Sequence, residues 1–367
     1  MLRLGITGLQ LSGKSTVFAA LTGGRQPAQL GGAGRGPAMH VAVVKVPDLR
    51  LEQLGRMNPG RKLVSAEVEY VDFPYASLGR RGREEAAWIG SLRTVDALVV
   101  VVRAFSSERV LHEETSEPLA DTESIELELI VNDLPIIEQR LQRLALDLGR
   151  ARASERGPLS REQSMLVQVQ MQLEANVPVR AMSLDVETER LLRGFQLLSA
   201  KPLLVVLNVG EEELSQVASL EQELASAIGE HAGASVLAIC GQLEMELVQL
   251  ADDSERQAFL DDLGITELAA HRAIRASYHL CGLRSFFTIG DDEIRAWTVP
   301  SGSLAPQAAG AVHTDMQKGF IRAETVSFEA LAGAGDMAAA RRQGFLRQEG
   351  RSYAVADGDV IHFLFSR

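Results

Sequence analysis

Residues 8–16 read GLQLSGKST, which is a complete phosphate-binding loop. Gly8 and Gly13 are separated by four residues, and Lys14 and Ser15 follow directly. Glycine lets the backbone approach phosphate oxygens closely, so that successive N–H groups point inward at the anion. In such loops the lysine reaches the β- and γ-phosphates, and the serine hydroxyl ligates Mg²⁺. The spacing therefore predicts nucleotide binding; a ligand-free glycine-rich turn is the alternative.

The segments on both sides of the loop are those that this chemistry requires. MLRLGIT precedes it as a short apolar strand, and TVFAALTGG follows it as a helix that stops at glycine. A helix that begins at the loop points its first N–H groups and its positive dipole end at the phosphates. We therefore expect the whole loop to contact the nucleotide: Gly8, Leu9, Gln10, Leu11, Ser12, Gly13, Lys14, Ser15 and Thr16.

A second magnesium ligand is expected at the end of the strand after the first helix. Asp72 follows the apolar run VEYV and fits that role. The usual D-x-x-G pattern, whose glycine amide senses the γ-phosphate, is absent because Phe73, Pro74 and Tyr75 follow the acid. Residues 23–46 contain neither Thr nor Ser, so the hydroxyl group of a first switch is missing as well. Two of the usual hydrolysis contacts are therefore absent.

The base-reading motif also departs from that of most GTPases. Where they carry N-K-x-D, this chain has Asn208, Val209, Gly210 and Glu211 after the apolar run KPLLVVL. The Lys is missing, and so is the Asp that pairs with the edge of guanine. The sequence thus predicts a purine site, for ATP or GTP, without strong selection for guanine.

The distribution of apolar runs predicts an α/β fold. β-branched runs at 41–46, 66–73, 95–105, 201–209 and 234–240 are typical of strands covered on both faces. We assign them to one parallel, doubly wound sheet of a Ras-like P-loop domain. The long gap after the third run indicates an insertion.

The insertion reads as a pair of long helices. Apolar residues step by four and three residues, the seam of a coiled coil: Ile130, Leu134, Ile137, Leu141, Leu144 and Leu148. A break follows, and Ser160 with Gln163 forms a capping box that predicts the start of a returning helix after Pro158. We favour plain hairpin packing over a ligand site here, although a projecting hairpin can also serve as a partner-binding arm.

Charge is distributed unevenly along the chain. The formal net charge is −12, which disfavours general nucleic-acid binding. Residues 283–367 carry nine basic and ten acidic side chains, so the rest carries about −11. The C-terminal part, with short alternating segments and a helix near 327–346, is therefore the better candidate for contact with RNA.

Composition indicates a cytoplasmic protein. No apolar run approaches membrane-spanning length, and the N-terminus lacks the pattern of a signal peptide. The cysteines, Cys240 and Cys281, have neither disulfide-framework nor metal-site spacing. We expect neither a membrane nor a sequence-specific DNA site as partner.

The chain resembles the YchF-type Obg-like ATPases, a branch of the translation-factor GTPases, over essentially its whole length. Besides the P-loop, the resemblance includes RTVDALVVVVRAF at 93–105 and LLSAKPLLVVLNVGEEE within 178–213. The C-terminal blocks are the most specific: RAWTVPSGSLAPQAAGAVHTDMQKGFIRAE at 295–324 and YAVADGDVIHFLF at 353–365.

The resemblance implies a domain plan and an activity. The Ras-like domain would take residues 1–115 and 196–282, the helical coiled-coil insertion 116–195, and a TGS domain of β-grasp fold 283–367. The family hydrolyses ATP at least as well as GTP and associates with ribosomes, so the implied partner is the ribosome, through its RNA or protein. His112 matches the family's loop histidine, which would stabilise charge on the γ-phosphate; a surface-loop histidine is the alternative.

Departures from the family pattern affect hydrolysis. Leu11 stands where the family has an Asn that supports K⁺, which removes the basis for a K⁺ requirement. Arg80 and Arg81, with Arg83 nearby, would supply the missing positive charge, unless they form only a solvated face. The base-contacting S-A-K motif is replaced by a tripeptide that we assign to the nucleotide site: Cys240, Gly241 and Gln242.

Two functions follow from these features. The first is a slow, Mg²⁺-dependent ATPase that acts as a translation-linked switch, with charge stabilised by His112 or an arginine. The second is a nucleotide-binding adaptor with negligible turnover, which contacts its partner through the helical arm and the TGS domain. In that domain, polar residues suited to a contact surface are His313, Asp315, Lys318 and Arg322.

Overall fold

The computed structural model describes residues 1–24, 28–30, 39–73, 83–105, 117–228, 233–250 and 252–366. The chain separates into two compact units. The P-loop unit comprises Arg3–Ala42 and Glu69–Ala273, and the C-terminal unit comprises Met1–Leu2, Val43–Val68 and Ile274–Arg367. In the part that is described, no helix is both long and apolar enough to cross a membrane.

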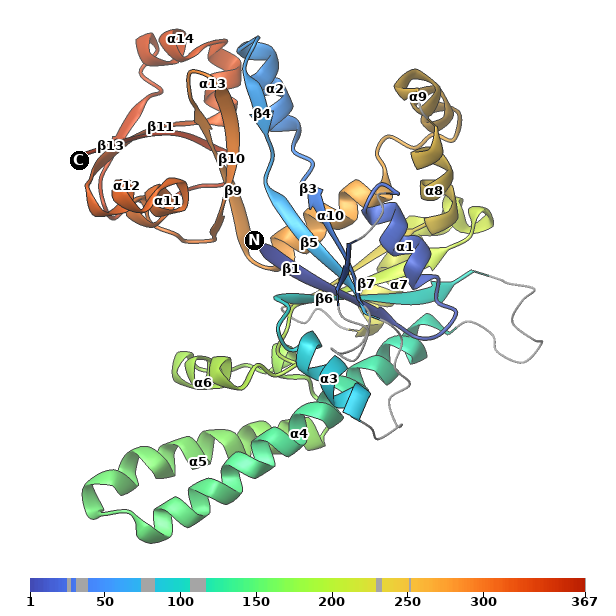
Figure 1. The fold of residues 1–367 in the computed structure, drawn as a ribbon, viewed down its shortest axis with the longest axis vertical. Helices are drawn as coiled ribbons and strands as arrows, with labels where there is room; N and C mark the ends of the chain where they lie inside the picture. The colour runs from blue at the N-terminus through green and yellow to red at the C-terminus, as the bar shows by residue number, and fades with distance from the viewer. Residues whose placement is uncertain are drawn as a thin grey trace. The chain divides into compact units, whose positions relative to one another are not determined.

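A seven-stranded sheet organises the P-loop unit, with the order β2-β3-β5-β1-β6-β7-β8 (Figure 1). The strands are β1 (Leu2–Gly8), β2 (Ala28–Leu30), β3 (Met39–Lys45), β5 (Glu67–Asp72), β6 (Ala97–Ala104), β7 (Leu203–Val209) and β8 (Ala234–Ile239). β1, β6, β7 and β8 pair in parallel, whereas β2 is antiparallel to β3. Because β1 lies between strands that come later in the chain on both sides, the sheet has a switch point at the P-loop.

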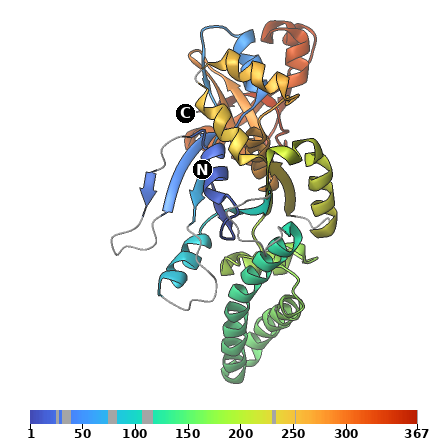
Figure 2. The same cartoon turned by 90° about the vertical axis from the view of Figure 1, so that its right-hand side faces the viewer.

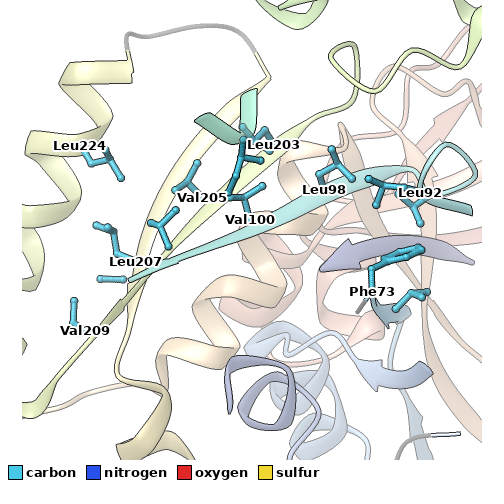
Figure 3. Close-up of a cluster of buried hydrophobic side chains, with 14 of the residues drawn as sticks. Phe73, Leu92, Leu98, Val100, Leu203, Val205, Leu207, Val209 and Leu224 are labelled. Carbon is cyan, nitrogen blue, oxygen red and sulfur yellow. The ribbon is translucent and has the colours of Figure 1, made fainter. Parts of the chain in front are cut away.

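The central strands are buried on both faces. Every residue of β7 is buried, as the apolar run LLVVL at its start predicts for a covered parallel strand. Figure 3 shows Leu203, Val205 and Leu207 of this strand beside Val100 of β6 and Leu224. Each such side chain contributes about 1.5–3 kcal/mol relative to an exposed one. This core fixes the strand ends that carry the polar site.

Helices complete the P-loop unit. They are α1 (Lys14–Leu21), α3 (Arg83–Leu92), α7 (Val217–Ile228), α8 (Gly241–Gln249), α9 (Asp253–Asp262) and α10 (Ala269–Leu280), which runs on into the C-terminal unit. Short 3-10 turns lie at Val179–Ala181, Arg193–Phe195 and Glu211–Gln216.

The insertion is a helical hairpin of α4 (Pro118–Arg150) and α5 (Ala153–Glu174), followed by α6 (Val186–Leu192). α4 and α5 lie side by side in both views (Figures 1 and 2). Ile130, Ile137 and Leu144 are buried at the seam, and Leu134 and Leu141 pack against them. The heptad spacing therefore identified the packed face.

The start of α5 differs from the expectation drawn from the capping box. Ser160 and Gln163 lie inside the helix, which begins at Ala153. The Glu155 side chain accepts from the N–H of Arg152 at 3.0 Å and caps the helix there instead. Pro158 is the sixth residue of α5 and lies beyond the first turn, so it removes the hydrogen bond that an N–H there would donate to the carbonyl oxygen of Ser154. The turn between the helices shrinks to two residues.

The C-terminal unit holds a six-stranded sheet, ordered β12-β11-β13-β9-β10-β4. The strands are β4 (Lys62–Val64), β9 (Leu283–Ile289), β10 (Glu293–Pro300), β11 (Phe320–Ser327), β12 (Arg347–Glu349) and β13 (Asp359–Phe365). The helices are α2 (Leu49–Met57), α11 (Ala305–Val312), α12 (Thr314–Lys318), α13 (Phe328–Ala334) and α14 (Met337–Arg342), so two short helices occupy the region expected to hold one.

A segment from the N-terminal third of the chain takes part in this second sheet. β4 pairs in parallel with β10, and Arg50 of α2 donates to Asp357 at 2.8 Å and lies over the Phe287 ring. The domain ranges drawn from the sequence place this segment with the P-loop and stay a prediction. Val43–Val68 belongs to the same compact unit as the C-terminal sheet.

We predict that Asp133 fixes the base of the hairpin. This carboxylate is fully buried and accepts from the backbone N–H groups of Leu198 and Ser199 at 2.9 and 2.7 Å and from Arg93 at 2.7 Å. Asp133→Ala leaves the arginine uncompensated and should lower the free energy of unfolding by about 3–5 kcal/mol. Chemical denaturation measures it. Glu162→Ala is the control: it removes the partner of Arg140 from a pair whose side chains are 19% and 33% exposed, and it should cost about 1 kcal/mol. Equal losses would contradict the assignment.

Candidate functional site

The P-loop adopts the backbone that anion binding requires. Leu11 and Gly13 have positive φ angles of 65° and 79°, and Gly13 lies at the N-terminus of α1. A Cβ on Gly8 would lie 2.4 Å from the carbonyl oxygen of Val101, and one on Gly13 would lie 2.1 Å from Nδ2 of Asn208. Both glycines are therefore needed for close packing as well as for conformation. Leu11 adopts the same left-handed conformation, although its Cβ makes that conformation unfavourable.

Lys14 and Asp72 meet at the carboxyl ends of β1 and β5. The lysine Nζ contacts Oδ1 of the carboxylate, and both side chains are nearly buried, with 11% and 8% of their surfaces exposed. His40 of β3 lies with Nδ1 3.8 Å from the other carboxylate oxygen. Sequence reasoning missed His40, because only strand pairing brings this position to the acid. The three side chains form a polar cluster beside the phosphate loop.

Two hydroxyl groups bear on whether phosphate and Mg²⁺ fit here. Ser12 is 2% exposed, and its Oγ has no hydrogen-bond partner among the described residues. A buried, unpaired hydroxyl group is costly unless a ligand satisfies it. Ser15 is exposed, and with Asp72 it offers the hard oxygen donors that Mg²⁺ prefers. Within the described ranges no three His, Cys, Asp or Glu side chains gather as a cage.

Asn208 ties the P-loop to the loop that follows β8. Its Nδ2 donates to the carbonyl oxygen of Ser12 at 3.0 Å, and its Oδ1 accepts from the N–H of Gly241 at 3.1 Å. The residue is 5% exposed. Since both halves of the carboxamide are used, Asn208 holds the two loops together and has a structural part in the site.

A cavity of about 700 Å³ opens beside these loops. Its walls come from the P-loop and α1, from the ends of β6, β7 and β8, from the 3-10 turn after β7 and from α8: Gly13, Thr16, Phe105, Asn208, Val209, Gly210, Glu211, Glu212, Glu213, Cys240, Gln242, Met245, Glu246 and Gln249. The volume is in the range of small-molecule sites. Phe105 was missed by sequence reasoning, because a single aromatic residue after a strand gives no specific signal.

The cavity wall is acidic and carries no Lys or Arg side chain among its described members. Gln242 donates to Glu246 at 3.3 Å on the exposed side of α8. Burial raises the pKa of the Cys240 thiol, which therefore stays protonated at neutral pH. Such a wall repels phosphates and suits the base end of a nucleotide, whereas Lys14 lies in the phosphate loop.

Some predicted site residues are not placed. His112, Arg80 and Arg81 lie outside the described residues, and Arg83 begins α3 without a described side chain. The P-loop, Asp72, Asn208, Glu211 and the tripeptide 240–242 all come to the carboxyl edge of one sheet. This is the edge at which open α/β sheets bind ligands.

The fold and the loop geometry define a P-loop nucleotide-binding protein. The Ribosome-binding ATPase YchF of Bacillus subtilis is 37% identical over all of this chain and 99% of its own length, and its namesake from Escherichia coli O157:H7 is 35% identical over 99% of both chains. The solved YchF GTPase of Schizosaccharomyces pombe matches with a TM-score of 0.85 and 27% identity, covering 99% of this chain and 97% of that one. The family model YchF-GTPase_C, described as a protein of unknown function, matches residues 283–366. This chain belongs to the YchF family, and the expected α/β P-loop fold class is confirmed.

We predict that Leu11 strains the P-loop backbone. Two substitutions at this position distinguish relief of that strain from the gain of a K⁺ ligand. Leu11 is 59% exposed and left-handed, a conformation that costs most residues about 1–2 kcal/mol and suits Gly and Asn better. Leu11→Gly and Leu11→Asn should both leave the protein at least as stable as the wild type in chemical denaturation. Only the asparagine adds an oxygen, so only that variant should show faster single-turnover hydrolysis in K⁺ than in Na⁺. Equal K⁺ stimulation in both would contradict the prediction.

We predict that Glu244 makes stability fall as pH rises. The side chain is 5% exposed, Oε1 accepts from the N–H of Ala269 at 2.6 Å, and Oε2 has no partner in the described part of the chain. Burial raises the pKa of Glu244 above its unfolded value. The folded state thus favours the protonated acid. The free energy of unfolding falls as pH rises from the pKa of Glu244 in the unfolded chain to its higher pKa in the folded protein.

Glu244→Gln keeps the acceptor and removes the charge. Its free energy of unfolding should exceed that of the wild type at pH 8 by on the order of 1 kcal/mol, and the difference should shrink toward pH 4. Denaturant titrations at both pH values measure this. Glu246→Gln, an exposed change on the same helix, is the control. A difference that is independent of pH would rule out the titration.

Proposed function

We propose that this chain is a Mg²⁺-dependent ATPase that binds ATP, or GTP, at the P-loop and works in association with the ribosome in the cytoplasm. The observation that carries the proposal is the pairing of an anion-binding loop, containing Lys14 and the unsatisfied Ser12 hydroxyl, with an acidic cavity of about 700 Å³ on the same edge of the sheet. The names of the bacterial relatives, Ribosome-binding ATPase YchF, supply the partner.

The polar cluster explains how the loop would receive a triphosphate. Lys14 contacts Asp72 in this structure. The β- and γ-phosphates of a bound triphosphate would compete with Asp72 for the ammonium group, and Lys14 would turn toward them. Ser15 and Asp72 would hold Mg²⁺, which when bound neutralises charge that develops on the phosphates. The backbone N–H groups of the loop would hold the β-phosphate in place. These residues would therefore account for nucleotide binding, and hydrolysis would need further groups.

The base end would be set by shape and charge. Because the acidic wall repels phosphates, it favours the orientation that places the purine beside Glu211 and the tripeptide 240–242. The N–H of Gly241 is already donated to Asn208, so it is not free to read a base carbonyl group. An exocyclic amine, which adenine and guanine both carry, could donate to Glu211. This supports a site that discriminates only weakly between adenine and guanine.

Slow hydrolysis is part of the proposal. Charge on the γ-phosphate would be stabilised by His112, Arg80 or Arg81, which stay predictions from the sequence. A well-placed arginine is worth about 10³–10⁵ in rate, so turnover depends on whether one of them reaches the phosphate. Leu11 offers no oxygen to K⁺, and the proposal therefore includes no K⁺ requirement.

A nucleotide-binding adaptor with negligible hydrolysis is the second candidate. The observation that favours it is the strained Leu11 in place of an oxygen ligand, beside a lysine that is engaged by Asp72. In that case occupancy alone would set the protein's affinity for the ribosome.

We predict that Lys14→Ala lowers the affinity for ATP by about 100-fold, because it removes a charge-assisted contact worth about 1.5–3 kcal/mol. Titration with fluorescent ATP and GTP analogues in Mg²⁺ measures binding, and single-turnover hydrolysis in K⁺ or Na⁺ measures chemistry. Lys45→Ala, an exposed lysine on β3, is the matched control.

The outcomes separate the two candidates. Tight binding with turnover that is indifferent to K⁺ supports the ATPase, whereas tight binding without turnover supports the adaptor. If wild-type protein binds neither nucleotide, or if Lys14→Ala binds as well as the wild type, the P-loop is not the site and both candidates fail.

A further inference from the structure

His40 is the third member of the polar cluster beside the phosphate loop. Its Nδ1 lies 3.8 Å from Oδ2 of Asp72, while Lys14 contacts the other carboxylate oxygen, Oδ1. Among the described residues, Asp72 thus has one nitrogen-bearing side chain against each of its oxygens. The imidazole is 48% exposed, whereas the carboxylate is 8% exposed. His40 is therefore a half-exposed neighbour of a nearly buried carboxylate.

The apolar core fixes the backbone on both sides of this contact. His40 lies on β3, and Asp72 lies at the end of β5, the neighbouring strand of the sheet. Val41 follows the histidine, and Val71 and Phe73 flank the acid. These three apolar residues are buried in one cluster, where close packing opposes any shift of either strand. The meeting of His40 with Asp72 is thus set by two packed strands.

A bound triphosphate would change the surroundings of Asp72. In this structure the ammonium group of Lys14 compensates the carboxylate, and under the proposed function that lysine turns toward the phosphates. A nearly buried carboxylate that loses its cation is costly, and nothing on that side then fixes its orientation. His40 belongs to another strand and would stay beside Oδ2. It is therefore placed to hold the carboxylate after the lysine has moved.

The imidazole has the chemistry that this task requires. Nδ1 carries a hydrogen in the imidazolium ion and in one of the two neutral tautomers, so donation to Oδ2 does not depend on the charge of His40. The distance of 3.8 Å exceeds that of a hydrogen bond by about 1 Å, which a half-exposed ring can close by changing its side-chain torsions. Outer partners of this kind orient metal-ligating carboxylates, and their loss typically costs about 10–100-fold in metal affinity.

We propose that His40 is a positioning residue for Mg²⁺: it donates from Nδ1 to Oδ2 of Asp72 and so keeps Oδ1, which Lys14 vacates, available to the metal. The inference rests on the proposed function, which supplies the nucleotide and Mg²⁺. The alternative is a solvated strand histidine whose distance from the carboxylate is incidental. The two differ in whether His40 contributes to the gain in ATP affinity that Mg²⁺ brings.

The test measures the affinity of the full-length chain for a fluorescent ATP analogue, once in saturating Mg²⁺ and once in EDTA. The ratio of the two dissociation constants is the gain that Mg²⁺ brings. His40→Leu keeps the bulk of the side chain and removes the donor, so it should cut this gain about tenfold and leave the affinity in EDTA unchanged. His40→Asn should restore most of the gain, because its amide nitrogen lies as many bonds from Cβ as Nδ1 does.

A control and a double-mutant cycle establish that the effect passes through Asp72. Lys45→Ala removes an exposed nitrogen-bearing side chain from the same strand and should leave both affinities unchanged. In an Asp72→Asn background, His40→Leu should reduce the gain no further, since the group that it orients no longer ligates as a carboxylate. A full tenfold loss in that background would indicate direct contact between His40 and the nucleotide and would overturn the proposal.

The outcomes separate this proposal from the function on which it rests. If the wild type binds no ATP, or binds it equally well with and without Mg²⁺, the proposed function fails and this inference fails with it. If the wild type shows the gain and His40→Leu keeps it, the proposed function stands and the role of His40 is overturned. Equal losses in Mg²⁺ and in EDTA would also overturn it, because a merely structural histidine lowers both affinities.

Discussion

The carboxamide of Asn208 constrains the entire nucleotide edge. It joins the P-loop to the start of α8 through one donor and one acceptor, so neither loop can move independently of β7. The same group excludes a side chain at Gly13, where a Cβ would lie 2.1 Å from it, and would crowd one at Gly241, where a Cβ would lie 3.1 Å away. A single buried side chain therefore bears on residue choice in two segments that are distant from it in sequence. Its position depends in turn on the apolar core that keeps β7 central.

Charge is separated along the site. The lysine and the N–H groups lie at the phosphate loop, while four glutamates lie on the wall of the cavity. In the proposed site, opposite signs at the two ends would favour one orientation of a nucleotide before any specific base contact forms. Holding the triphosphate, admitting the purine and hydrolysis would then depend on different residues.

The sequence predicted those parts of the site that local pattern determines. The P-loop, Asp72 and Asn208 follow strands whose apolar runs are unmistakable, and parallel strands bring their carboxyl ends to one edge. His40 escaped notice because strand pairing alone places it, and Phe105 because a single aromatic residue after a strand gives no specific signal. The predicted start of α5 at Ser160 was wrong. Ser160 and Gln163 match the common capping-box pattern, but Glu155 caps the helix earlier in the chain. β4 was missed because its partner, β10, comes from the far end of the chain.

That last pairing has a consequence for the order of folding. β4 leaves the ribosome early in synthesis, but most of the chain must follow before β10 emerges to receive it. Until then Leu51 and Leu54 of α2 are uncovered, and Arg50 lacks its carboxylate partner Asp357. The C-terminal unit can therefore close only at the end of translation. A fragment beginning at residue 283 would lack one edge of its sheet, so this part of the protein is compact in space without being an independent stretch of its gene.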